Sequence, residues 1–158
     1  MTAPPPPSEA NQFLAEHVGL IRRRFRHRTG RELTPARMSD AEAARYLYTA
    51  PWALLSHDTQ PDPLFNYANQ TALGVFAMTW DEMTRCPSRL SAEADRREER
   101  AALLRDVAER GYSDGYRGIR IGRHGRRFVI EAATVWNLVD ARDIYRGQAA
   151  SFGHWRWL

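Results

Sequence analysis

The sequence contains no lysine, and all 23 of its basic residues are arginine. Exclusive use of arginine indicates the codon bias of a GC-rich bacterial genome, so arginine content alone is no argument for nucleic-acid binding. The single cysteine, Cys86, cannot form an internal disulfide. The sequence has no apolar run long enough to cross a bilayer and no signal segment at its start. These absences predict a cytoplasmic protein.

The patterns that mark common catalytic and metal sites are missing too. The histidines have no ligand spacing among themselves, and there is no second cysteine, so no metal is expected. The sequence has no glycine-rich phosphate loop and no serine in a nucleophile-elbow setting. The sequence therefore predicts no catalytic residues, and it leaves any cofactor unknown.

The first third of the chain is predicted to be helical after a short irregular start. Residues 1–8, which include four consecutive prolines, are expected to be a disordered lead-in. Residues 9–50 read as a helical extension, in which Gly30 ends a first helix and Ser39 or Asp40 caps a second. One apolar stripe at helical spacing marks the first helix: Leu14, Val18, Ile21 and Phe25.

Residues 51–158 read as a mixed domain of strands and short helices. Short strands are predicted at residues 52–56 and 64–67, and longer strands at 112–121, 126–138 and 144–152. Three helices between them are predicted from their caps, which are Asn69, Thr79 with Glu82, and Asp95 with Glu98. Strict alternation in the fourth strand puts these residues on one face: Phe128, Ile130, Ala132, Thr134, Trp136 and Leu138.

Several segments resemble known families. The stretch "YANQTALGVFAMTWDEM" resembles PAS-type sensory domains, in which an asparagine caps the first short helix after the second strand. The segments "SHDTQPDPLFNYANQTAL", "MTWDEMTRCPSRLSAE" and "FVIEAATVWNLVD" are similar to small bacterial members of the MEKHLA family, which is PAS-related. The resemblance implies an α+β fold: a PAS-like five-stranded antiparallel sheet with short helices over one face, and N-terminal helices packed on the outside.

The resemblance also implies a sensory or interaction domain without an effector domain of its own, which binds a small ligand or a protein partner. PAS ligands lie between the sheet and the short helices. The expected pocket residues are Asn66, Trp80, Tyr116, Arg120, Phe128, Ile130, Thr134 and Trp136.

The register of the hairpin at residues 122–125 decides whether Arg120 belongs to this pocket. A longer PAS-like loop, which the resemblance favours, turns Arg120 and Tyr116 inward, whereas a two-residue turn would turn Ile119 and Ile121 inward. An inward arginine needs an anion or a carboxylate partner. Arg120 thus either holds an acidic small molecule, pairs with Glu131 or another carboxylate, or is exposed.

Three other features have competing interpretations. His57 beside Asp58 could be the base of an enzyme, but strand alternation separates the two side chains, and Asp58 suits a turn. Cys86 lies one position out of step with the reactive cysteine of flavin photosensors, so no flavin photochemistry is expected. Six arginines between Arg22 and Arg31 suggest either phosphate contacts or, as we favour, a solvated helix face.

Two features allow for partners. Trp155 and Trp157 share one face if the tail is a strand, and they pack either on the sheet or on a partner. The apolar stripe of the first helix likewise permits a homodimer. We expect a PAS-like ligand or partner binder; the alternatives are an enzyme that uses the same cavity with His57 as base, and nucleic-acid binding through the arginine run.

Overall fold

The computed structural model describes residues 4–35, 37–92 and 97–158. The helical elements are η1 (Glu9–Asn11), α1 (Ala15–Thr29), α2 (Asp40–Tyr48), α3 (Gln70–Phe76), α4 (Trp80–Thr84), η2 (Ser88–Ser91), α5 (Arg97–Arg110) and η4 (Arg123–Gly125). The strands are β1 (Ala53–His57), β2 (Phe65–Ala68), β3 (Tyr112–Ile121), β4 (Arg127–Val139), β5 (Tyr145–Phe152) and β6 (His154–Trp157). None of the helices in these ranges is both long and apolar enough to span a membrane.

The strands form one antiparallel sheet in the order β2-β1-β5-β4-β3, and β6 also pairs with β4. The predicted five-stranded sheet is therefore present, with a sixth strand that the sequence reading missed. β6 continues the edge of β5 after Gly153, so that the long strand β4 pairs with β5 over its second half and with β6 over its first half. Trp155 and Trp157 lie opposite Ile130 and Phe128 in this pairing.

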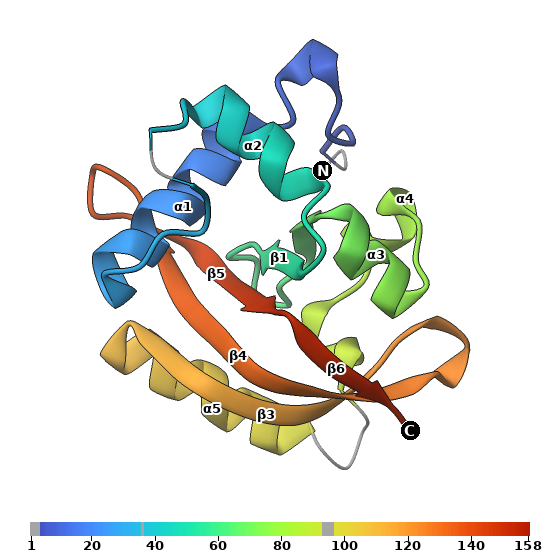
Figure 1. Ribbon diagram of the computed structural model, residues 1–158. Helices are drawn as coiled ribbons and strands as arrows, with labels where there is room; N and C mark the ends of the chain where they lie inside the picture. The colour runs from blue at the N-terminus through green and yellow to red at the C-terminus, as the bar shows by residue number, and fades with distance from the viewer. Residues whose placement is uncertain (1–3, 36, 93–96) are drawn as a thin grey trace.

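Helices cover both sides of the sheet. Figure 1 shows α1 and α2 on one side of β4 and β5, and α5 on the other side. The core on the α1 side is formed by Val18, Ile21, Phe25, Leu47, Leu54, Tyr67, Trp136 and Leu138, among others. The core on the other side contains Leu55, Phe65, Val75, Phe76, Met83, Phe128, Ile130 and Phe152. The predicted apolar stripe of the first helix is thus buried against the sheet.

The ends of the short helices follow the predicted caps. The side chains of Ser39 and Thr79 accept hydrogen bonds from the third residue of α2 and α4 in capping boxes, and Asn69 caps α3 through the amide of Ala72. Gly30 ends α1 in the left-handed region at φ 71°. The cap predicted at Asp95 lies outside the described residues.

Two β-bulges change which residues of β4 share a face. The pairing of β3 with β4 shifts between Ser113 and Tyr116, and shifts again between Tyr116 and Gly118. The second shift inserts an extra residue in β4, where Ala132 has a positive φ of 53°. Strict alternation along this strand was therefore a wrong expectation. Phe128 and Ile130 face α3 and α5, whereas the residues after the bulge reverse their sides.

The start of the described chain makes defined contacts. Residues 4–8 belong to the segment expected to be a disordered lead-in. In the structure the indole Nε1 of Trp80 donates a hydrogen bond of 2.8 Å to the carbonyl oxygen of Pro4, and Pro7 is buried. The lead-in, like the expected division of the chain at residue 50, stays a prediction.

Candidate ligand-binding site

A cavity of about 60 Å³ lies between the sheet and α5. Its walls come from β1, β2, β3, β4 and β5 on the sheet side and from α3, η2 and α5 on the helix side. Most of the lining is apolar: Leu55, Phe65, Phe76, Leu103, Leu104, Ile130, Val135, Ala149, Ala150 and Phe152. The polar lining residues are Ser56, His57, Ser91, Arg100, Tyr116, Arg120 and Gln148.

Two arginines project into this cavity from opposite walls. Arg100 comes from α5 and Arg120 from β3, and they are only 8% and 9% exposed. Arg120 donates to the hydroxyl oxygen of Tyr116 and to the carbonyl oxygen of Ile119, each at 3.0 Å. No hydrogen bond or ion pair joins Arg100 to any described residue. Burial, together with the neighbouring charge of Arg120, lowers the pKa of Arg100 to about 10.

These two arginines place a net positive charge inside the domain. At neutral pH both guanidinium groups are protonated, since the lowered pKa of Arg100 is still well above 7. Within the described part of the chain, neither one has a carboxylate partner. A buried cation without a counter-charge is strongly unfavourable, so this wall of the cavity favours an anion.

His57 and Gln148 form a second polar part of the lining. Both side chains are buried, with 8% and 3% exposure. The imidazole Nε2 of His57 and the amide Oε1 of Gln148 have no hydrogen-bond partner among the described residues. The pKa of His57 is lowered, mainly by burial and also by the charge of Arg100. His57 is therefore a neutral imidazole beside the two cations.

The structure brings together three of the pocket residues predicted from the sequence. Tyr116, Arg120 and Ile130 line the cavity. Arg120 pairs with Phe128 across the hairpin, the register that turns Arg120 and Tyr116 inward. Glu131, the alternative partner of Arg120, instead lies 3.8 Å from both Arg117 and Arg156. Phe128 lies on the same face as the cavity and stacks edge-on against Phe76 with ring centroids 5.1 Å apart.

The other predicted pocket residues lie elsewhere. Thr134 and Trp136 follow the bulge in β4 and face away from the cavity, where Trp136 packs on α1. Asn66 accepts a hydrogen bond of 2.6 Å from Ser56 on the α1 side of the sheet. Trp80 packs edge-on against Tyr67 with ring centroids 6.1 Å apart. The bulge in β4 turns Thr134 and Trp136 away from the cavity. Asn66 on β2 and Trp80 on α4 instead make their contacts outside the cavity.

Sequence reasoning missed Arg100 and Gln148. It weighed His57 as a possible base against a partly buried imidazole at the end of a strand, and did not place it in the pocket. Each of them breaks an apolar pattern. Arg100 shares a helix face with Leu103, Leu104 and Val107, at spacings of three, four and seven residues. Gln148 shares one face of β5 with Ala150, and His57 shares one face of β1 with Leu55. A polar residue on an otherwise apolar stripe was the signal available.

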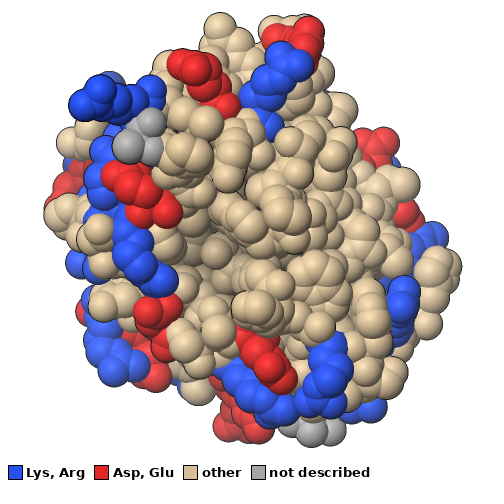
Figure 2. All heavy atoms as spheres, in the orientation of Figure 1, with Lys and Arg blue, Asp and Glu red and all other residues tan. Residues whose placement is uncertain are grey.

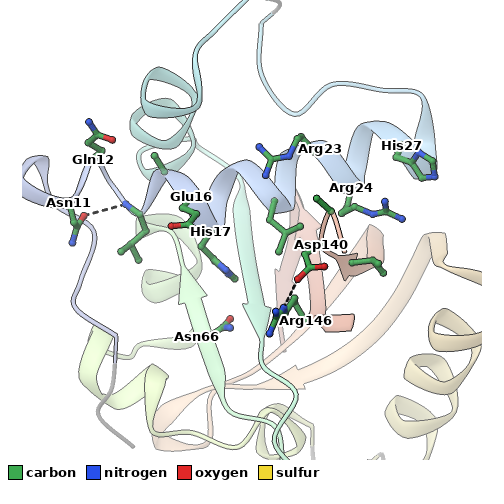
Figure 3. A pocket seen from close by; sticks show the side chains of 15 residues that line it. Asn11, Gln12, Glu16, His17, Arg23, Arg24, His27, Asn66, Asp140 and Arg146 are labelled. Carbon is green, nitrogen blue, oxygen red and sulfur yellow. Dashed lines mark hydrogen bonds and ion pairs between the residues drawn. The ribbon is translucent and has the colours of Figure 1, made fainter. Parts of the chain in front are cut away.

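A second hollow is a surface groove of about 1010 Å³ along α1. Figure 3 shows His17 projecting from α1 on the side where Asn66, Asp140 and Arg146 lie. Asp140 and Arg146 pair with each other across the turn after β4. None of its polar lining residues is fully buried, and half of them are exposed, so water reaches these residues. Figure 2 shows the charged residues gathered at the rim of this view and uncharged side chains in its middle. The interior cavity is therefore the better candidate site.

The comparisons with known proteins identify the family. The model of the MEKHLA domain family matches residues 15–157. This chain belongs to the MEKHLA family. The match includes α1 and α2 as well as the sheet. No curated protein sequence matched the chain.

Solved structures similar to the MEKHLA domain are PAS and LOV domains. A PAS domain from Colwellia psychrerythraea has a TM-score of 0.60 at 13% identity, over 73% of this chain and 92% of the other. A fungal LOV photoreceptor domain has a TM-score of 0.57 at 14% identity, over 90% and 92%. A PAS domain in complex with ethanol, from a LuxR-family regulator of Burkholderia thailandensis, has 0.53 at 14%, over 72% and 95%. The MEKHLA domain thus has a PAS-like fold.

The structure also places the other residues that drew attention in the sequence. The carboxylate of Asp58 accepts hydrogen bonds from the backbone amides of Gln60 and Leu64, as expected of a turn residue. Cys86 is half-buried on the cavity side of the core, and burial raises the pKa of its thiol. Within the described residues, no group of three or more His, Cys, Asp or Glu side chains could hold a metal ion.

The arginine run of the MEKHLA domain is largely engaged by acidic residues. Four of its arginines lie within 4 Å of a carboxylate. The pairs are Arg22 and Arg23 with Asp40, Arg26 with Glu32, and Arg31 with Asp114. Because the apolar stripe of α1 is buried against the sheet, a homodimer would need another surface. Both homodimer and protein partner stay predictions.

His17 makes the stability of the MEKHLA domain depend on pH. Its Nε2 lies 2.9 Å from the hydroxyl of Ser56, and burial lowers its pKa to about 4. Between pH 6.5 and 4 the imidazole of His17 is protonated in the unfolded chain but neutral in the folded chain. Stability is therefore full above pH 6.5 and falls as the pH drops toward 4, by about 2–3 kcal/mol from this residue.

Urea unfolding of wild type and His17→Gln at pH 7.5 and 4.5 checks this prediction. The variant should lose less stability on acidification than the wild type. A residual slope is expected, because the pKa of His57 is also lowered, chiefly by burial. Equal pH dependence in the two proteins would contradict the assignment.

Proposed function

We propose that this MEKHLA domain is a sensory domain that binds a small acidic molecule in the cavity between the sheet and α5. The observation that carries the proposal is the pair of buried guanidinium groups, Arg100 and Arg120, which line this cavity without a carboxylate partner in the described residues. A bound carboxylate would supply the missing counter-charge and accept hydrogen bonds from both.

The size of the cavity supports a small ligand. One water molecule needs about 10–15 Å³ of cavity volume. A cavity of about 60 Å³ therefore has room for about four to six waters, or for a ligand with about as many heavy atoms. Pockets for drug-sized ligands usually measure about 300–1,000 Å³. The PAS neighbour solved with ethanol is an example of this fold with a very small molecule bound.

The position of the two arginines supports a sensory role. Arg100 belongs to α5 and Arg120 to the sheet. An anion between them would draw the two walls together, whereas without it the two like charges repel each other. Ligand binding would then change how α5 sits on β3 and β4, and this movement is the signal that a partner could read.

Thermal unfolding with a panel of small carboxylates tests the proposal. At a concentration 100 times its Kd, a bound acid adds about 2.7 kcal/mol, which raises Tm by about 5–10 °C in a protein of this size. Arg120→Gln and Arg100→Gln should each weaken binding at least about 30-fold. The matched controls are Arg117→Gln on β3 and Arg105→Gln on α5, which are exposed and should bind as the wild type does.

Two outcomes would contradict the proposal. The first is that no acid raises the Tm of the wild type. The second is that the Arg100 and Arg120 variants bind acids as their exposed controls do. A further readout separates ligand binding from a purely structural role: Arg100→Met should raise Tm in the absence of acid, because it removes a buried charge that lacks a partner. Turnover of a bound acid that requires His57 would instead favour the enzyme hypothesis.

A further inference from the structure

The hydrogen-bond pattern around Gln148 fixes the orientation of its amide. Its Nε2 donates to the carbonyl oxygen of Leu104 at 3.1 Å and to Oδ1 of Asn137 at 3.0 Å. Asn137 is itself fixed, because its Nδ2 donates to the carbonyl oxygen of Val107 at 2.8 Å. A flipped Gln148 amide would put its oxygen against two acceptors. The free Oε1 of Gln148 is thus an acceptor at the cavity wall.

His57 presents a second acceptor beside it. Its Nδ1 lies 2.9 Å from the backbone carbonyl oxygen of Asp58. A carbonyl can only accept, so Nδ1 carries the hydrogen and the neutral ring leaves a lone pair on Nε2. The side chain of Gln148 lies beside this ring and raises the pKa of His57 against the larger effect of burial. No hydrogen bond of good geometry to a described residue occupies either Nε2 of His57 or Oε1 of Gln148.

One part of the cavity therefore lacks an anion and the other lacks a donor. The guanidinium groups of Arg100 and Arg120 need negative charge, and the hydroxyl hydrogen of Tyr116 is free because its oxygen accepts from Arg120. The two acceptors, Oε1 of Gln148 and Nε2 of His57, need an O–H or N–H group. An ammonium group would be repelled by the arginines, whereas a hydroxyl would not.

We infer that the ligand is a small 2-hydroxy acid, with its carboxylate at Arg100 and Arg120 and its hydroxyl donating to Gln148 or His57. This inference rests on the proposed function of the same cavity. The smallest members of the class have five or six heavy atoms, which agrees with the room for about four to six that a cavity of about 60 Å³ provides. The apolar lining suits the short carbon chain.

Matched pairs of acids that differ by one hydroxyl test the inference in the full chain. We expect titration calorimetry to show that glycolate binds about tenfold tighter than acetate, and lactate about tenfold tighter than propionate. Gln148→Met and His57→Phe each remove one acceptor and should reduce the preference for the hydroxyl, measured as the ratio of the glycolate and acetate affinities of each variant. The control is Thr134→Val, which removes a buried hydroxyl that donates to Asp114 at 2.7 Å and does not line the cavity, so this variant should keep the preference.

The outcomes separate this inference from the proposed function. Equal affinities for glycolate and acetate in the wild type would contradict the 2-hydroxy acid inference but not the proposed acid-binding site. This comparison uses the wild type alone, so it does not depend on the folding of a variant. A preference that is unchanged in both acceptor variants would overturn it as well. If none of the four acids binds, the acid site fails together with the inference.

Discussion

Replacing Asn69 with alanine should lower the free energy of unfolding by about 4 kcal/mol, and Tm by roughly 10 °C. Asn69 is fully buried and makes four hydrogen bonds, all to the backbone. Its Oδ1 accepts from the amides of Leu54 and Ala72, and its Nδ2 donates to the carbonyls of Leu47 and Trp52. Alanine leaves these groups without partners, and each buried one costs about 1–3 kcal/mol.

Two further variants show what kind of role Asn69 has. Aspartate is as good a helix cap as asparagine, but it would bring a second carboxylate oxygen toward two carbonyls and bury a charge. Asn69→Asp should therefore be at least as destabilising as Asn69→Ala. Thr79→Ala, which removes an exposed cap, should cost only about 1 kcal/mol. Urea unfolding measures all three, and a near-neutral Asn69→Asp would show that Asn69 is a cap and nothing more.

The caps illustrate what the sequence can predict. Ser39, Thr79 and Asn69 each act on the residue three positions further along the chain, so their role depends on neighbours that the sequence itself specifies. The other bonds of Asn69 cannot be predicted in this way. They connect the start of α3 with the end of α2 and the start of β1, which lie 15 to 22 residues earlier in the chain and meet Asn69 only after the chain has folded.

The faces of β4 show where local reasoning stops. Its length and its register with β3 near the hairpin follow from the sequence, since alternation and loop length are local. The bulge at Ala132 is compensated by another in β3, where Gly115 has a φ of 73°. Such a pair of bulges depends on two strands at once. One extra residue was enough to move Thr134 and Trp136 out of the predicted pocket.

The arginines of the candidate site differ in the same way. The inward direction of Arg120 follows from the hairpin register, and the sequence left two registers open. Arg100 lies on a helix that was predicted from its cap, yet the place of Arg100 among the apolar residues of that helix was overlooked. Its importance depends on α5 bringing it opposite Arg120, and no pattern within one element contains that juxtaposition.

Trp136→Ala should destabilise the domain by about 3–5 kcal/mol, because it removes the largest side chain between α1 and the sheet. Trp136 is fully buried, its Nε1 donates to the carbonyl oxygen of Ile21 at 3.1 Å, and its ring packs edge-on against Phe25 with centroids 5.0 Å apart. The damage should be local to the α1 side. Hydrogen exchange should show faster exchange in α1, while the amides of α5 keep most of their protection.

Ligand binding separates this role from the one expected from strict alternation. If Trp136 lined the ligand cavity, its removal would change acid affinity; since it faces α1, the folded variant should bind acids within about threefold of the wild type. The matched comparison is Ile130→Ala on the same strand before the bulge, because Ile130 lines the cavity. That variant enlarges the cavity and should shift the preference toward larger acids. A Trp136→Ala protein that keeps its α1 protection but loses acid binding would contradict the face assignment of β4.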